Sequence, residues 1–98
     1  MPLVSVIMPC FNHARFLPAA IESVLAQSHA ELELIVTDDC SRDDSWTVMQ
    51  EYARRDTRVR LVRHAANGGL PKSRNDAMAV SRGEFLAFCD SDDVWNPD

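Results

Sequence analysis

The sequence predicts an α/β fold, in which a parallel, Rossmann-like sheet lies between helices in a three-layer α/β/α arrangement. Short apolar segments rich in β-branched residues alternate with longer segments whose apolar residues recur at helical spacing. The resulting order, β-α-β-α-β-α-β, favours parallel strands joined by right-handed crossovers. Polar clusters follow several of these strands, at the carboxyl ends where such sheets bind ligands.

The composition is typical of one globular domain over residues 1–98. Hydrophobic residues make up 46% of the chain and charged residues 26%, and the net charge of −5 argues against binding to nucleic acid. No apolar stretch approaches the roughly 18–20 residues of a membrane span, and no signal peptide is evident. The cysteines are odd in number, widely spaced and without a CxxC motif, which is typical of reduced thiols. We therefore expect a cytoplasmic chain, possibly membrane-associated as part of a longer protein.

The first strand and helix are predicted from the amino-terminal segment. Residues 4–8 are apolar and largely β-branched, which indicates a strand buried on both faces and ended by Pro9. Asn12 is a candidate N-cap for a helix over residues 14–27, because its side chain can accept a backbone N–H at the helix start.

The middle of the chain predicts a second strand, a second helix and a third strand. Residues 32–37 form a second apolar strand, and residues 41–44 (SRDD) resemble a capping box for a helix over residues 43–55. Residues 59–63 alternate apolar with basic side chains, which predicts a strand with one solvated face near the sheet edge.

The last third of the chain predicts a turn, a helix and a fourth strand. Residues 67–69 (NGG) are a turn signal, and Pro71 can open a helix over residues 71–82. Gly83 is expected to close that helix as its C-cap. Residues 84–89, which are apolar from Phe85 onward, predict a buried fourth strand.

An acidic cluster follows the fourth predicted strand. It consists of Asp90, Ser91, Asp92 and Asp93. Such a cluster can be a solvated turn or a helix cap, since aspartate favours both. It can equally hold a divalent cation, because Mn²⁺ or Mg²⁺ takes one or two carboxylates together with phosphate oxygens. The position directly after a strand favours the metal interpretation.

Other polar residues are expected at the same edge of the sheet. Asp38 and Asp39 follow the second strand, and either form a turn or accept hydrogen bonds from a nucleobase or ribose. Gly68 and Gly69 form a turn but would also let the backbone approach a diphosphate. Arg74 is either a surface side chain or a phosphate partner.

Two aromatic residues are further candidates for the site, and two nucleotide-binding motifs are absent from the sequence. Phe11 is interpreted as a core residue on its own, with base stacking as the alternative, and Trp95 as packing rather than ligand binding. The sequence contains neither GxGxxG nor GxxxxGK[ST], which argues against dinucleotide-binding and P-loop proteins.

Taken together, three segments resemble the nucleotide-sugar-binding part of a family 2 glycosyltransferase with the GT-A fold. They are VSVIMPCFNHARFLPAAIESVLAQS, ELELIVTDDCSRDDS and NGGLPKSRNDAMAVSRGEFLAFCDSDDVW. The segments occur in the family's order and cover nearly all of residues 3–95. Each motif alone is weak, whereas the combination is specific.

The resemblance implies a nucleobase pocket. Pro9, Phe11 and Asn12 match the family's P-x-[YF]-N segment, which lines that pocket, although tyrosine often stands where this chain has Phe11. Asp39 matches the acid that recognises the uracil edge, and Asp38 would help to shape the pocket. Stacking on the base is therefore expected to survive without a phenolic hydroxyl.

The resemblance also implies a diphosphate site. Arg74 matches an arginine near the base and phosphates, and Asp90-Ser91-Asp92 matches the D-x-D motif. Asp90 would face the ribose and sugar. Asp92 would be the main ligand, and Asp90 a further ligand, of an Mn²⁺ or Mg²⁺ ion that joins the diphosphate.

The implied activity is metal-dependent, inverting transfer of a sugar from a nucleotide-diphospho-sugar, with UDP as the expected nucleotide. The acceptor would be a hydroxyl of a saccharide or lipid-linked acceptor in polysaccharide biosynthesis. The family's catalytic base lies downstream of the D-x-D motif, and the sequence ends at Asp98. We therefore expect residues 1–98 to be a fragment that binds nucleotide weakly and transfers no sugar.

Alternative functions remain open at this point. The chain could be a non-catalytic nucleotide-binding fragment, or could form a homo-oligomer through an exposed sheet edge. A haloacid-dehalogenase-like phosphatase is a remote alternative, because its D-x-D motif opens the chain rather than closing it. A phospho-receiver domain is disfavoured because its acidic pair follows the first strand.

Overall fold

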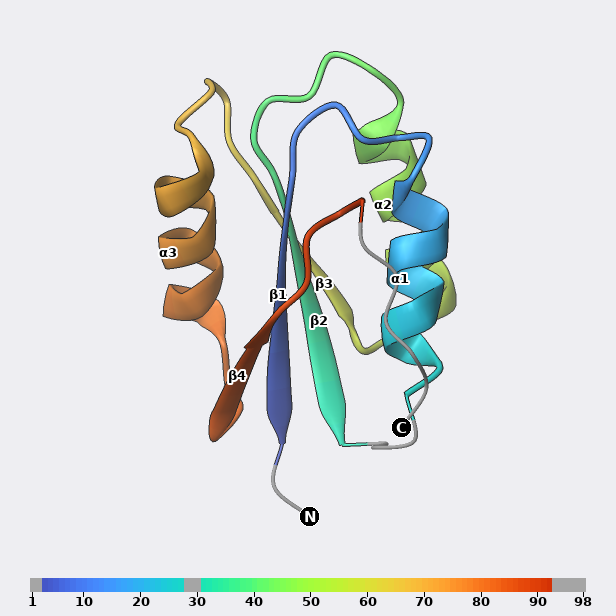
Figure 1. The fold of residues 1–98 in the computed structure, drawn as a ribbon, viewed down its shortest axis with the longest axis vertical. Helices are drawn as coiled ribbons and strands as arrows, with labels where there is room; N and C mark the ends of the chain where they lie inside the picture. The colour runs from blue at the N-terminus through green and yellow to red at the C-terminus, as the bar shows by residue number, and fades with distance from the viewer. Residues whose placement is uncertain (1–2, 28–30, 93–98) are drawn as a thin grey trace.

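The computed structural model describes residues 3–27 and 31–92, which form a parallel sheet with helices on both faces (Figure 1). The strand order in this sheet is β3-β2-β1-β4. In chain order the elements are β1 (Val4–Cys10), α1 (Leu17–Leu25), β2 (Leu32–Asp38), α2 (Ser45–Arg55), β3 (Val59–Arg63), α3 (Leu70–Val80) and β4 (Phe85–Phe88). The predicted parallel α/β arrangement and element order are confirmed.

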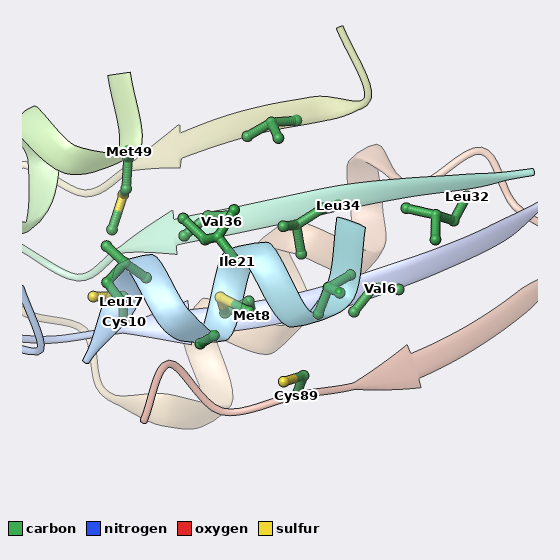
Figure 2. Close-up of a cluster of buried hydrophobic side chains, with 13 residues drawn as sticks. Val6, Met8, Cys10, Leu17, Ile21, Leu32, Leu34, Val36, Met49 and Cys89 are labelled. Carbon is green, nitrogen blue, oxygen red and sulfur yellow. The ribbon is translucent and has the colours of Figure 1, made fainter. Parts of the chain in front are cut away.

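The central strand β1 is buried on both faces, as predicted. Val6, Met8 and Cys10 belong to the larger core, to which α1 and α2 contribute (Figure 2). Ile7 belongs to a second core on the α3 side, where it packs with Ile35 of β2. Because successive side chains of a strand point to opposite faces, both layers of helices require a continuous apolar run in β1.

Each helix buries one apolar stripe against the sheet. Leu17, Ile21 and Val24 of α1 are buried, as are Met49 of α2 and Ala77 of α3. The helices lie on opposite faces, with α1 and α2 on one side and α3 on the other (Figure 1). None of the helices in the described part of the chain has the length and hydropathy needed to cross a membrane.

The predicted end of the first strand at Pro9 is wrong, because β1 continues to Cys10. The carbonyl of Ile7 accepts the N–H of Cys89 at 3.1 Å, and the pairing of β4 with β1 ends at Ile7. Pro9 lies two residues further on, so its backbone faces the same neighbouring strand, β4, as that of Ile7. At Pro9, however, β4 no longer pairs with β1. The N–H that proline lacks is therefore not needed there.

The predicted starts of the first two helices are also wrong. The helix α1 begins only at Leu17, after Phe16 in the N-cap position, and Asn12 lies outside it with a left-handed φ of 54°. The helix α2 begins at Ser45 rather than at residue 43. Asp43 accepts hydrogen bonds from the N–H and hydroxyl of Ser45, at 2.9 and 2.6 Å, instead of forming the predicted capping box.

The two edge strands differ in their agreement with the sequence. The predicted position of β3 at the sheet edge is confirmed, but the predicted solvated face is wrong, because Leu61 packs against the larger core and Val62, on the opposite face, packs against the second core. The prediction of a buried β4 is wrong, because Phe85, Leu86 and Phe88 are 57%, 45% and 48% exposed. The reason is topological: in the described sheet β4 pairs only with β1, so an apolar strand lies at the edge.

A buried carboxylate organises the amino end of the sheet. Glu33 of β2 accepts hydrogen bonds from the Ser5 hydroxyl at 2.6 Å, from Arg60 at 2.9 Å and from the Arg82 N–H at 2.6 Å. Burial alone would raise the pKa of Glu33, but these donors lower it below the usual range. The network joins β1, β2, β3 and the connection from α3 to β4.

Gly83 closes this network instead of capping α3, so the predicted C-cap is wrong. The C-cap of α3 is Ser81, and the Gly83 N–H donates to the Ser5 hydroxyl at 2.8 Å. A Cβ atom at Gly83 would lie 2.5 Å from that hydroxyl and 2.7 Å from the Leu3 carbonyl oxygen. Glycine is required here by close approach of two backbones.

We expect Gly83→Ala to destabilise the protein by about 1–3 kcal/mol, because the backbone of β1 must move away from the added methyl group. The free energy of unfolding in urea measures this. Gly68→Ala is the matched control, since its Cβ would meet only the flexible side chain of Lys72, 2.4 Å from Cδ. An equal loss in both variants would contradict the explanation.

Candidate functional site

A cavity of about 490 Å³ lies at the carboxyl ends of the strands. Its walls come from four segments that are far apart in the sequence: the end of β1, the residue after β2, the start of α3 and the residues after β4. The lining residues are Pro9, Cys10, Phe11, His13, Asp39, Asn67, Gly69, Leu70, Ser73, Asp90, Ser91 and Asp92. Most of the residues that the sequence singled out thus surround one space.

The segment after β1 presents an aromatic ring to this cavity. Phe11 is 43% exposed, so its interpretation as a core residue is wrong. Asn12 instead lines an adjoining cavity of about 390 Å³, which shares Phe11 and Asn67 with the first. The boundary between the two spaces is therefore formed by Phe11 and Asn67.

Asn12 connects the loop after β1 to the loop after β2. Its side-chain oxygen accepts the N–H of Arg42 at 2.7 Å, and its own N–H donates to the Ser41 hydroxyl at 2.9 Å. Asparagine tolerates the left-handed φ that this geometry needs. Asn12 therefore fixes the backbone beside Phe11 rather than capping a helix.

Asp39 is the most densely bonded polar residue of the cavity wall. Its Oδ1 accepts hydrogen bonds from the Gly68 N–H at 2.7 Å and from the His64 ring at 2.8 Å, while its Oδ2 accepts the Gly69 N–H at 2.9 Å. Burial would raise the pKa of the carboxyl, but the bonds from Gly68, His64 and Gly69 together lower it. Asp39 therefore presents an ionised, acceptor-only group at the cavity.

Asp38 lies behind the cavity wall. Its side chain is fully buried, its Oδ1 accepts the Ser41 N–H at 3.0 Å, and its Oδ2 is 3.6 Å from Nε of Arg63. Arg63 in turn stacks over the ring of Trp46 at 4.7 Å. Asp38 therefore holds the loop that follows Asp39 and does not itself line the cavity.

The D-x-D segment combines two exposed carboxylates with a buried serine. Asp90 and Asp92 are exposed, whereas Ser91 is 1% exposed and its hydroxyl is 2.5 Å from Nδ1 of His13. Arg74 does not line the cavity but lies 3.7 Å from Asp90. The serine anchors the segment so that both neighbouring carboxylates reach solvent at the cavity.

The D-x-D segment offers two exposed carboxylates as candidate ligands of a divalent cation. Within residues 3–27 and 31–92, no group of three or more His, Cys, Asp or Glu side chains could hold a metal by itself. Mg²⁺ and Mn²⁺ commonly take only one or two carboxylates and complete their coordination with water and phosphate oxygens. Asp93 and Trp95, two further candidates, lie outside the described residues.

Sequence reasoning missed two histidines. His13 contacts Ser91, and His64 lies between Asp39 and Asp76, yet neither histidine is among the site residues that the sequence predicts. A usable signal existed, because His64 directly follows β3 and His13 closely follows β1. Residues just past a parallel strand reach the same edge of the sheet as the acidic clusters.

Comparison with known proteins places this site in a family. The profile described as "Glycosyl transferase family 2" matches residues 5–98. The putative teichuronic acid biosynthesis glycosyltransferase TuaG of Bacillus subtilis is 41% identical over 97 residues, which are 99% of this chain and 38% of that protein. The Escherichia coli protein named UDP-Glc:alpha-D-GlcNAc-diphosphoundecaprenol beta-1,3-glucosyltransferase WfgD is 41% identical over 93 residues, 95% of this chain and 36% of that protein.

Solved structures share the fold. S. aureus TarS 1–349 in complex with UDP matches with a TM-score of 0.85 and 33% identity, over 96% of this chain and 28% of that one. Mannosyltransferase PcManGT from Pyrobaculum calidifontis, in complex with GDP-Man and Mn²⁺, matches with a TM-score of 0.89 and 26% identity, over 96% and 28% of the two chains. These matches agree with the expected GT-A fold.

The compared proteins are much longer than this chain, which spans 38% of TuaG and 36% of WfgD. The match nevertheless extends over nearly all of the sequence, including the three segments on which the resemblance was based. It favours a glycosyltransferase over the phosphatase and phospho-receiver alternatives. The chain belongs to glycosyl transferase family 2.

Proposed function

We propose that this chain forms the donor-binding part of a glycosyltransferase that uses a nucleotide-diphospho-sugar, with UDP as the nucleotide. The observation that carries the proposal is the cavity itself. An exposed aromatic ring, Phe11, and an ionised acceptor, Asp39, line the same space as the two carboxylates Asp90 and Asp92. A nucleoside diphosphate offers a matching base at one end and phosphates at the other.

The wall at Asp39 suits a base with an N–H group. Among the described residues, Oδ2 of Asp39 takes the Gly69 N–H, and a carboxylate oxygen can accept a second hydrogen bond. The imide N–H of uracil, or the corresponding N–H of guanine, could donate to it, whereas the ring nitrogen of cytosine could not. The UDP complexes of TarS and the UDP-Glc in the name of WfgD favour uracil.

The wall at Asp90 and Asp92 suits the diphosphate. We propose that Asp92, with Asp90, holds Mn²⁺ or Mg²⁺; the Mn²⁺ in the PcManGT complex supports this choice. When bound, the cation would neutralise the charge that develops on the departing nucleoside diphosphate. Gly68 and Gly69 keep the backbone beside the site free of Cβ atoms, and Arg74 positions Asp90 through their ion pair.

Transfer also needs an acceptor and a base. We propose inversion at the anomeric carbon by direct attack of an acceptor hydroxyl, which requires a general base near that hydroxyl. No described residue is assigned this role. The names of TuaG and WfgD support a saccharide or lipid-linked acceptor in polysaccharide biosynthesis. That residues 1–98 alone bind nucleotide without transferring sugar, and that the chain is cytoplasmic, stay predictions.

Association through the sheet edge is a second possibility that one observation favours. Phe85, Leu86 and Phe88 form an exposed apolar strip along β4. Such an edge can pair with another strand. A monomer in size-exclusion chromatography across the concentrations used for binding would argue against a homo-oligomer of this chain.

The metal site makes a sharp prediction. Mn²⁺ should tighten UDP binding to the wild-type chain. In Asp92→Ala the gain in UDP affinity caused by Mn²⁺ should be about tenfold smaller, which corresponds to roughly 1.4 kcal/mol. Calorimetric titration of UDP, with and without Mn²⁺, measures it. Glu31→Ala, which removes one exposed carboxylate at the opposite end of the sheet, should bind as the wild type does. Undiminished metal dependence in Asp92→Ala would refute the assignment.

The base site makes a second prediction. Phe11→Ala should weaken UDP binding by about 1–3 kcal/mol, the usual contribution of aromatic stacking on a base, while Phe11→Tyr retains it. Phe85→Ala is the matched control, because Phe85 is equally aromatic and exposed but lies on β4. If both alanine variants lose affinity equally, Phe11 does not stack on the base.

A further inference from the structure

His64 lies buried between two carboxylates, immediately after β3. Its Nδ1 is 2.8 Å from Oδ1 of Asp39, and its Nε2 is 2.7 Å from Oδ2 of Asp76 on α3. The histidine is 8% exposed, so water cannot readily replace either partner. Asp39 lines the cavity of the proposed donor site, whereas Asp76 lies on the far side of the ring.

The number of protons on the His64 ring determines how many of the two carboxylates it can donate to. A neutral imidazole carries one N–H, so it can donate to only one of the two carboxylates and turns a lone pair toward the other. The imidazolium form donates to both. The other charged group at the cluster is Lys72, whose Nζ is 3.2 Å from Asp76. The two ring contacts are therefore satisfied together only when His64 is protonated.

The bond to His64 helps to determine how Asp39 faces the cavity. Oδ1 of Asp39 accepts from both His64 and the Gly68 N–H, which leaves Oδ2 with the Gly69 N–H on the other side of the carboxylate. The charge of the imidazolium also compensates that of a carboxylate that is 5% exposed. Loss of the proton would leave the ring free to abandon either carboxylate.

We infer that His64 is a positioning residue for the nucleotide donor: as an imidazolium it clamps Asp39 in the orientation that accepts the base. This rests on the proposed function. Donor affinity should therefore be higher when the imidazolium is present than when the ring is neutral. This difference should disappear in a variant where a neutral histidine can satisfy both neighbours.

Asp76→Asn is that variant. An asparagine amide can donate to the Nε2 lone pair of a neutral ring, whose Nδ1–H then stays on Asp39. We expect the affinity of the wild type for UDP to be about tenfold lower at high pH than at low pH, as loss of a charge-assisted bond implies. Asp76→Asn should lose less affinity than the wild type over the same pH interval, because the contribution of His64 is removed and that of the UDP phosphate remains.

The measurement is NMR titration of the wild-type chain, Asp76→Asn and His64→Gln with UDP. His64→Gln should bind about tenfold more weakly than the wild type at low pH and show a flatter profile, because its amide donates to one carboxylate only. The phosphate of UDP also titrates, near about pH 6, and His13 lines the cavity. Asp76→Asn leaves both unchanged, so the difference between profiles isolates His64.

The outcomes separate the two proposals. Ring ¹⁵N signals that show both nitrogens of His64 protonated at low pH, together with an Asp76→Asn profile less steep than that of the wild type, support the inference. A profile in Asp76→Asn as steep as that of the wild type, or wild-type affinity in a folded His64→Gln, overturns it while the donor site stands. Absence of UDP binding to the wild-type chain at every pH overturns the proposed function and this role of His64 with it.

Discussion

The buried carboxylate of Asp39 is the contact on which the candidate site depends. Through its side chain it holds the turn at Gly68 and Gly69, and through its backbone N–H it bonds to the carbonyl of Cys10 at the end of β1, at 2.9 Å. A buried ionised group is costly unless its hydrogen bonds are made, so these donors must remain in place. The turn before α3 is thereby fixed against the central strand, and Phe11 and the start of α3 line one cavity.

The polar groups at the two ends of the sheet differ in how far their hydrogen-bonding capacity is used. At the amino end, Glu33 joins Ser5, Arg60 and Arg82 in a network whose members mostly satisfy one another. At the carboxyl end, polar groups keep unused acceptor capacity: Asp90 and Asp92 are exposed. Saturated networks stabilise a fold, whereas unsaturated acceptors beside a cavity are available to a ligand.

Within the site, two histidines each hold one residue in place. His13 holds Ser91 from the loop after β1, and His64 holds Asp39 from the end of β3. Each binds a residue that flanks or lines the cavity and leaves the outward-facing carboxylates of the D-x-D segment untouched. In the site, Ser91 and Asp39 are thus fixed by hydrogen bonds to histidines, whereas the carboxylates of Asp90 and Asp92 remain exposed.

The sequence by itself determined the order of the elements, the parallel sheet and the family, because apolar periodicity and the three motif segments are local properties of the chain. It also placed Asp39, Asp90 and Asp92 at one edge, since all parallel strands end there. Only the tertiary structure decided the roles of Asn12, Gly83 and His64. Asn12 bonds to a loop thirty positions away and Gly83 to β1, so their partners are invisible to capping rules. The exposure of Phe11 and of β4 was likewise decided by which strands and helices lie beside them, because burial depends on neighbours that a linear pattern does not name.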